Sequence, residues 1–180
     1  MTNWPNEWAP LSNEVLTKLS KLKMIIFDVD GVFTDGTILR DELGNEQRRF
    51  SVLDGHGISR LRDFGLIVGV VSREPSEITK SRMEKLKMDE IHVGSKDKSV
   101  TVKEILTRRN LDVNSVAFMG DDIPDLAAFS EVGIKLAPSN AQPQIRNKAD
   151  WISNASGGNG AVREACEVII YSIESGRQGD

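Results

Sequence analysis

The chain has 180 residues, 39% of them hydrophobic, and its 23 Lys and Arg against 27 Asp and Glu give a formal net charge of −4. This length and composition predict one compact globular domain over residues 1–180, and the scattered basic residues argue against a nucleic-acid or anionic-membrane partner. The longest apolar run, residues 64–71, is too short to span a membrane, and a single cysteine cannot form an intrachain disulfide, so we expect a cytoplasmic protein.

Short apolar runs alternate with stretches of helical periodicity, the pattern of a parallel α/β sheet. The predicted strands cover residues 24–27, 66–71, 91–93, 116–119 and 134–136, with a weaker sixth at 151–152. The predicted helices cover residues 12–21, 57–64, 76–87, 99–109, 124–130 and 161–173. Helices between successive strands would serve as crossover connections.

The segment after the first strand departs from this alternation. Residues 37–40 and 47–52 flank a turn in which Gly44 and Asn45 can adopt a positive φ. We therefore predict a β-hairpin inserted over residues 36–52. Residues 1–22 form an N-terminal extension, and we expect its first ten residues, with Trp4 and Trp8, to lie loosely on the surface.

Acidic residues follow two of the predicted strands directly. The first strand runs into Asp28 and Asp30, whose i, i+2 spacing points both side chains the same way in extended chain. The fourth strand runs into Asp121, Asp122 and Asp125. Carboxylates gathered at one edge of a sheet repel unless a hard divalent cation lies among them, and oxygen ligands of this kind suit Mg²⁺. The alternative for Asp122 and Asp125 is that they cap the helix that follows.

Four motifs in order carry a resemblance to a known family. They are Asp28-Val-Asp-Gly-Val-Phe-Thr-Asp-Gly36, Ser72 at the end of the second strand, Lys98, and Gly120-Asp-Asp-Ile-Pro-Asp125. Together they resemble the motifs of haloacid dehalogenase-superfamily phosphatases. The hairpin after Thr34-Asp35-Gly36, and the runs Asp54-Gly-His-Gly-Ile58 and Gly157-Gly-Asn-Gly-Ala-Val-Arg-Glu164, look like its small capless branch, which contains the 3-deoxy-D-manno-octulosonate 8-phosphate phosphatases.

The resemblance implies a fold and a set of residue roles. The fold would be a three-layer, Rossmann-like parallel sheet with helices on both faces and a small hairpin in place of a cap domain. Asp28 would be the nucleophile that forms an aspartyl-phosphate, and Asp30 the acid and base that protonates the leaving alcohol and then activates water. Ser72 and Lys98 would contact the phosphoryl group. Asp28, the Asp30 carbonyl and Asp121 would hold Mg²⁺, with Asp122 acting on the ion through water or through another ligand.

The substrate is implied only as a class. An acidic 2-keto-3-deoxy sugar phosphate is expected, either 3-deoxy-D-manno-octulosonate 8-phosphate or a sialic-acid-type nonulosonate 9-phosphate. The octulosonate branch reads Thr-Gly-Arg where this chain has Ser72-Arg73-Glu74, and relatives that act on nine-carbon sugars carry Glu at the third position. The candidate substrate-binding residues are Thr34, Asp35, His56, Arg73 and Glu74.

Two other functions compete with this interpretation. A non-catalytic module that oligomerises a CMP-sugar synthetase has a related fold, but the presence of Asp28, Asp30, Lys98 and Asp121 argues against it. A receiver-like signalling domain also places acids around Mg²⁺, and the Asp30 position and the hairpin argue against that.

Two further features remain to be assigned. The hairpin is too small to cover its own site, so we expect a homo-oligomer, a tetramer by family resemblance, in which hairpins close neighbouring sites. The glycine-rich run over residues 157–160 is either an anion-binding turn or a flexible entry to the last helix.

Overall fold

The computed structural model describes residues 8–177 and contains a six-stranded parallel sheet. Its strands are β1 (Met24–Phe27), β4 (Ile67–Ser72), β5 (Glu90–Val93), β6 (Val116–Met119), β7 (Ile134–Ala137) and β8 (Trp151–Ile152). Their order across the sheet is β5-β4-β1-β6-β7-β8, and every neighbouring pair is parallel. The predicted α/β class and all six predicted strands are confirmed, with boundaries shifted by one residue at most.

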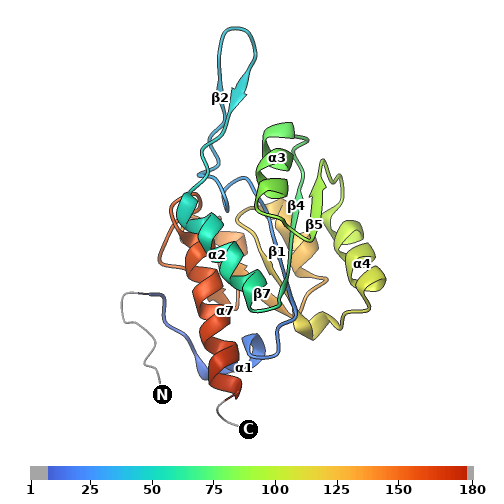
Figure 1. Cartoon of the computed structure of the whole chain (residues 1–180), viewed down its shortest axis with the longest axis vertical. Coiled ribbons are helices and arrows are strands. Elements are labelled where there is room, and N and C mark those ends of the chain that lie inside the picture. Colours follow the sequence, from blue (N-terminus) through green and yellow to red (C-terminus); the bar gives the residue numbers. More distant parts are fainter. Residues whose placement is uncertain (1–7, 178–180) are drawn as a thin grey trace.

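Helices cover both faces of the sheet (Figure 1). One face carries α1 (Asn13–Leu19), α2 (Val52–Asp63), α3 (Glu77–Lys85) and α7 (Ala161–Arg177). The other carries α4 (Lys98–Arg109), α5 (Leu126–Phe129) and α6 (Pro143–Arg146), with short 3₁₀ turns η1 (Val113–Ser115) and η2 (Ile123–Asp125). The three-layer arrangement expected from the family resemblance is therefore present.

The central strand β1 shows why the sheet is covered twice. Successive side chains of a strand point to opposite faces. Ile25 and Phe27 pack in the core with α2 and α7, whereas Met24 and Ile26 pack with α4 and α5. All four side chains are fully buried. A strand that is apolar on both faces needs helices on both sides of the sheet to keep it from water.

The hairpin is present but shorter than predicted. Its strands are β2 (Leu39–Arg40) and β3 (Glu46–Gln47), and it projects beyond the body of the molecule (Figure 1). The expected second strand over residues 47–52 is wrong from Arg48 onward. The Ser51 side chain accepts the Leu53 N–H as an N-cap, so α2 begins at Val52 rather than at residue 57.

The ends of the chain also differ from expectation. Ala9 is buried and its N–H donates to Glu164 Oε1 at 2.7 Å, so the expected loose N-terminal segment is wrong at this residue, while Trp4 lies outside the described residues. Helix α7 continues to Arg177, four residues past its predicted end, and the short helix α6 was not predicted. Within residues 8–177, no helix combines the length and apolar character needed to cross a membrane.

Candidate active site

The carboxyl ends of three central strands place the predicted catalytic residues at one edge of the sheet. Asp28 follows β1, Ser72 ends β4, and Asp121 lies two residues beyond β6. They line a pocket of about 400 Å³, in the crevice where open α/β sheets bind ligands. The other lining residues are Asp30, Gly36, Arg73, Glu74, Lys98, Asp122, Pro124 and Asp125.

Lys98 is the cation at the floor of this pocket. It is the first residue of α4, and Asp97 fixes the start of that helix by accepting the N–H groups of Ser99 and Val100. The Lys98 Nζ lies 2.7 Å from Asp28 Oδ1 and 2.5 Å from Asp125 Oδ1. Burial opposes the charge on Lys98, but the two carboxylates outweigh it and raise the pKa of the ammonium group.

The single positive charge of Lys98 does not balance the carboxyl groups around it, Asp28 and Asp121 among them. Burial and the charge of Asp125 raise the pKa of Asp28 to about 7, although Lys98 acts in the opposite direction. Burial and the charges of Asp28 and Asp125 raise the pKa of Asp121 to about 8. Two carboxyl groups that titrate near neutrality in one pocket need a further cation to be ionised together.

The donor set fits a divalent cation. Asp28, Asp121 and Asp125 each place a carboxylate oxygen within 4.8 Å of the others. Asp121 Oδ1 is buried and has no hydrogen-bond partner among the described residues. Gly31 makes room for it, because a Cβ there would lie 2.0 Å from Asp121 Oδ2, and its φ of +88° suits glycine. Hard carboxylate oxygens at this spacing suit Mg²⁺.

Asp125 and Asp122 shape the turn that follows β6. Asp125 Oδ2 accepts the N–H groups of Asp121 at 2.9 Å and Asp122 at 3.2 Å, and Oδ1 pairs with Lys98. Asp122 is exposed and its carboxylate accepts the Ile123 N–H at 2.7 Å. The capping alternative therefore describes both residues, and Asp125 in addition orients Lys98, a contact that the sequence did not indicate.

Asp30 is held by a residue that the sequence analysis missed. Its side chain is 29% exposed, and Arg48 Nη1 lies 2.5 Å from Asp30 Oδ1. The Arg48 side chain is fully buried at the base of the hairpin. A basic residue inside the predicted second strand of the hairpin gives no signal of this contact, since only the tertiary structure brings residues 30 and 48 together.

The predicted substrate-binding residues do not all reach the pocket. Arg73 and Glu74 are exposed and line it. Hydrogen bonding to Glu46 and, more weakly, the charge of Glu74 raise the pKa of Arg40 in the hairpin, so Glu74 lies within electrostatic reach of that element.

The remaining three lie outside the pocket lining. The buried Thr34 hydroxyl accepts the N–H groups of Gly31 and Gly36, at 3.3 and 3.2 Å, and so closes the turn after β1. Asp35 is exposed at the base of the hairpin, where it accepts from the Thr37 N–H and from Arg49. His56 is exposed on α2 and does not lie in the loop that we expected.

The glycine-rich loop before α7 is a packing element. The Gly157 N–H donates to Asn140 Oδ1 at 2.7 Å, and the Gly158 N–H donates to the Val32 carbonyl at 3.0 Å. A Cβ at Gly157 would lie 1.8 Å from the Gly31 carbonyl oxygen. These donors are used within the fold, so the anion-binding alternative is wrong for them, and the loop supports the turn after Asp28.

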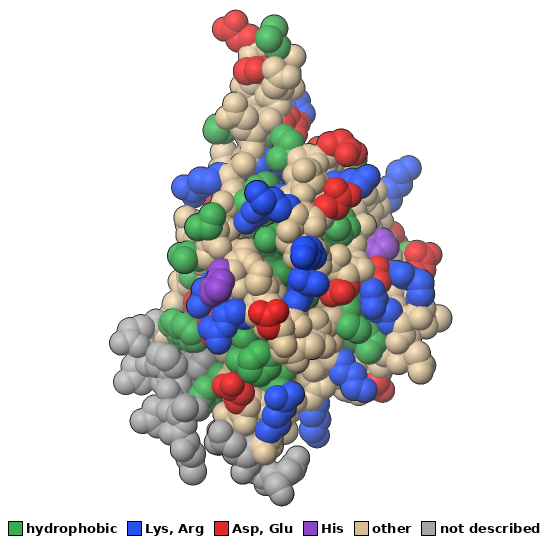
Figure 2. All heavy atoms as spheres, in the orientation of Figure 1, with side chains coloured by type: hydrophobic (Ala, Val, Ile, Leu, Met, Phe, Trp, Pro, Cys, Tyr) green, Lys and Arg blue, Asp and Glu red, His purple; other side chains and the backbone are tan. Residues whose placement is uncertain are grey.

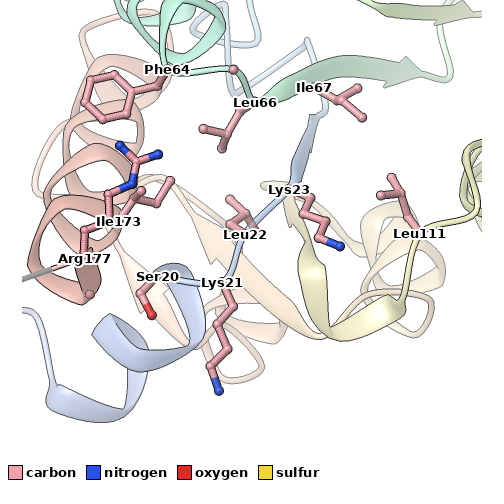
Figure 3. A pocket seen from close by; sticks show the side chains of 12 residues that line it. Ser20, Lys21, Leu22, Lys23, Phe64, Leu66, Ile67, Leu111, Ile173 and Arg177 are labelled. Carbon is pink, nitrogen blue, oxygen red and sulfur yellow. The ribbon is translucent and has the colours of Figure 1, made fainter. Parts of the chain in front are cut away.

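A larger pocket, of about 660 Å³, lies at the opposite edge of the sheet. It lies where β1 and β4 begin, beside the end of α7, and apolar side chains such as Leu22, Leu66 and Ile173 surround it (Figure 3). The described residues that line it include lysine and arginine but no carboxylate. It therefore lacks the carboxylates that line the smaller pocket.

Residues 69–164 match the family model of haloacid dehalogenase-like hydrolases. The chain belongs to this family. The 3-deoxy-D-manno-octulosonate 8-phosphate phosphatase of Yersinia pestis is 31% identical over 165 residues, which cover 92% of this chain and 88% of that protein. The matched region includes the last four residues of β4, Lys98 and the turn after β6, and the longer alignment adds most of the remaining chain.

Solved structures of such phosphatases have the same fold as this family member. The Moraxella catarrhalis 3-deoxy-D-manno-octulosonate 8-phosphate phosphatase, solved with magnesium, phosphate and KDO, is 31% identical with a TM-score of 0.87, over 94% of this chain and 99% of that one. The cobalt-bound deoxy-D-mannose-octulosonate 8-phosphate phosphatase of Haemophilus influenzae is 32% identical with a TM-score of 0.84, over 87% and 92%.

Proposed function

We propose that this hydrolase is a Mg²⁺-dependent phosphatase that cleaves an acidic 2-keto-3-deoxy sugar phosphate through an aspartyl-phosphate at Asp28. The observation that carries the proposal is the position of the Asp28 carboxylate, which lies 2.7 Å from Lys98 and shares a pocket with Asp121. Asp28 and Asp121 both lie just beyond the ends of central strands. The phosphatases to which the chain is similar, one of them solved with magnesium, phosphate and KDO, support the same chemistry.

The residues of the pocket divide the reaction between them. An oxygen of Asp28 attacks phosphorus as the bond from phosphorus to the sugar oxygen breaks, and Asp30 gives the leaving oxygen its proton. Asp30 then accepts a proton from the water that attacks the aspartyl-phosphate, which releases phosphate and restores Asp28. Lys98 and the Ser72 hydroxyl stabilise the phosphoryl oxygens during both steps.

Asp28, Asp121 and the Asp30 carbonyl would hold the Mg²⁺ ion, with Asp122 near it. When bound, the ion supplies the positive charge that lets a carboxylate approach a phosphate dianion. The electrostatics of the pocket support a second cation, since with Lys98 alone the pKa of Asp28 is about 7 and that of Asp121 is about 8.

Glu74 favours one of the two sugars. A carboxylate at the rim of the pocket repels the carboxylate of an acidic sugar but accepts hydrogen bonds from hydroxyl or N-acyl groups, whereas an arginine there would pair with the acid. A nonulosonate 9-phosphate offers such a polar tail, so we propose it as the preferred substrate over octulosonate 8-phosphate.

A panel of sugar phosphates assayed with Mg²⁺ and with EDTA tests the proposal. We expect Mg²⁺-dependent phosphate release, with the highest kcat/KM on a nonulosonate 9-phosphate. Glu74→Arg should shrink or invert the ratio to octulosonate 8-phosphate, while Glu84→Arg, an exposed change on α3, should not. A ratio that Glu74→Arg leaves unchanged within about twofold would remove Glu74 as the basis of the preference, and a wild-type ratio that favours octulosonate 8-phosphate would overturn the preference itself. No turnover on any keto-sugar phosphate would overturn the substrate class and favour the assembly-module alternative.

A further inference from the structure

We infer that Arg48 is a positioning residue, which holds the Asp30 carboxylate in place for proton transfer. The inference rests on the proposed role of Asp30 as the acid and base of this phosphatase. Its basis is the contact of 2.5 Å between Arg48 Nη1 and Asp30 Oδ1, made by an arginine whose side chain is fully buried.

Asp30 depends on this contact for its orientation. It precedes Gly31, which adopts a φ of +88°, so the backbone turns immediately after it. Its side chain is partly open to solvent. Among residues 8–177, Arg48 is the hydrogen-bonding partner found for the Asp30 carboxylate. A carboxylate in a turn with one anchoring group takes its orientation from that group.

Arg48 is itself held by contacts with two elements, the hairpin and α3. Its Nη1 donates to Thr79 Oγ1 at 3.3 Å, and its Nη2 lies 3.8 Å from Glu46 Oε2. Thr79 is fully buried in the first turn of α3, where Ser76 caps the helix. The guanidinium therefore lies between the base of the hairpin and α3 and reaches Asp30 from a fixed point.

The fold alone does not require a guanidinium at this position. Arg48 Nε and Nη2 are buried and have no hydrogen-bond partner within the described part of the chain, and unsatisfied buried donors destabilise the folded state. An unbranched apolar side chain of similar length would fill the same space without that penalty. A methionine would lose the 2.5 Å contact with Asp30, together with the longer contacts to Thr79 at 3.3 Å and Glu46 at 3.8 Å.

Four variants and a series of aryl phosphates test the inference. The phenol leaving groups of the series should range from acidic, as in p-nitrophenyl phosphate, to weakly acidic, because only the weakly acidic ones need a proton from the enzyme. The variants are Arg48→Met, Arg48→Lys, Asp30→Asn and the double variant of Arg48→Met with Asp30→Asn. Arg40→Met is the matched control, because it makes the same change at an exposed arginine of the same hairpin that pairs with Glu46.

We expect Arg48→Met to lower kcat/KM roughly 10- to 100-fold on the phenol that leaves least readily, and less than about threefold on p-nitrophenyl phosphate. Its melting temperature should stay unchanged or rise. Arg48→Lys should recover part of the lost rate, since it can still reach Asp30 with one donor. In the Asp30→Asn background, Arg48→Met should have no further effect, because the two residues act as one unit.

Three results would overturn the inference. The first is a loss of kcat/KM in Arg48→Met that is equal for every aryl phosphate. The second is a double variant in which the losses of the two single variants multiply. The third is an Arg48→Met protein whose loss of activity is fully explained by a lower melting temperature. Asp30→Asn separates the failure of this inference from the failure of the proposed function. If Asp30→Asn itself loses the same rate on all leaving groups, the acid role of Asp30 is wrong. If Asp30→Asn depends on the leaving group and Arg48→Met does not, only the role of Arg48 is wrong.

Discussion

Asp28 and Asp121 respond to pH in a direction that their surroundings determine. Burial and neighbouring carboxylates raise their pKa values to about 7 and about 8, from an ordinary value of 3.8. Between pH 3.8 and a pH of about 7 to 8, these two carboxyl groups keep their protons in the folded chain but have released them in the unfolded chain. Raising the pH through this window therefore lowers the stability contributed by the two groups, and a bound cation offsets the loss.

This imbalance predicts a pH-dependent stabilisation by Mg²⁺. At pH 8 and about 100 times Kd, Mg²⁺ should raise the melting temperature by roughly 5–10 °C over an EDTA sample. The shift should be much smaller at pH 5.5, where protons compete with the metal. Thermal unfolding at both pH values checks this, and Asp121→Asn should reduce the shift. Equal shifts at pH 5.5 and pH 8 would contradict the assignment of the ligands.

The sequence identified the groups at the floor of the pocket but not the contacts between them. Asp28, Asp121 and Lys98 follow from motif order and from strand ends, which meet at one edge of a parallel sheet. The pairing of Lys98 with Asp125 and of Arg48 with Asp30 comes from packing between distant segments. Local periodicity carries no information about such contacts.

The loop before α7 and the turn after β1 act as one packed element. Gly157 lies against the Gly31 carbonyl, and Gly158 bonds to Val32. The α7 N-terminus is held in turn by Asp54 of α2, which is buried and accepts the Arg163 N–H at 2.9 Å. The turn that carries Asp30 is thus supported from both α2 and α7.

Gly157→Ala should therefore damage both stability and catalysis. The added Cβ would lie 1.8 Å from the Gly31 carbonyl oxygen, so the turn must move. We expect a loss of roughly 1–3 kcal/mol in the free energy of unfolding and a lower kcat at temperatures where the variant is folded. Denaturant unfolding and steady-state kinetics measure both. Ser156→Ala, next in the chain, is the control, and unchanged kinetics in Gly157→Ala would show that the turn tolerates the shift.

The elements of the sheet were more predictable than the start of α2. The predicted bounds of β1 and β6 match the structure because both are continuous apolar runs buried on two faces. The predicted helix began only at Gly57, yet α2 begins at Val52 and contains both Gly55 and Gly57. A Cβ at Gly57 would lie 3.1 Å from Arg163 Cδ and Cys166 Sγ, so glycine here allows α2 to approach α7, a tertiary requirement that overrides helix propensity.

At the scale of the whole molecule, the hairpin exposes apolar side chains that no other part of the described chain covers. It stands clear of the body (Figure 2), with Ile38, Leu39 and Leu43 exposed by 40%, 61% and 87%. Val52 and Leu53 at the start of α2 add 78% and 58% exposed apolar side chains nearby. Large exposed apolar side chains on one projecting element indicate an interaction surface, which supports the expectation of a homo-oligomer.

We predict that the protein is a homo-oligomer, most simply a tetramer, with the hairpins at the interface and close to neighbouring active sites. Light scattering at assay concentration measures the mass. Leu39→Glu with Leu43→Glu should yield smaller species with reduced activity, while Val113→Glu, a comparable exposed site in η1, should leave the mass unchanged. A wild-type monomer with full activity would contradict this arrangement.

The central claim is that Asp28 forms the bond to phosphorus in a Mg²⁺-dependent reaction, and Asp28→Asn tests it most directly. This change removes a buried carboxyl group whose pKa is about 7, so the variant should stay folded, with a melting temperature near that of the wild type. Phosphate release with Mg²⁺ should fall at least about a thousandfold, whereas Asp63→Asn, an exposed aspartate at the end of α2, should keep the wild-type rate. A folded Asp28→Asn protein that retains a rate near the wild type would contradict the account.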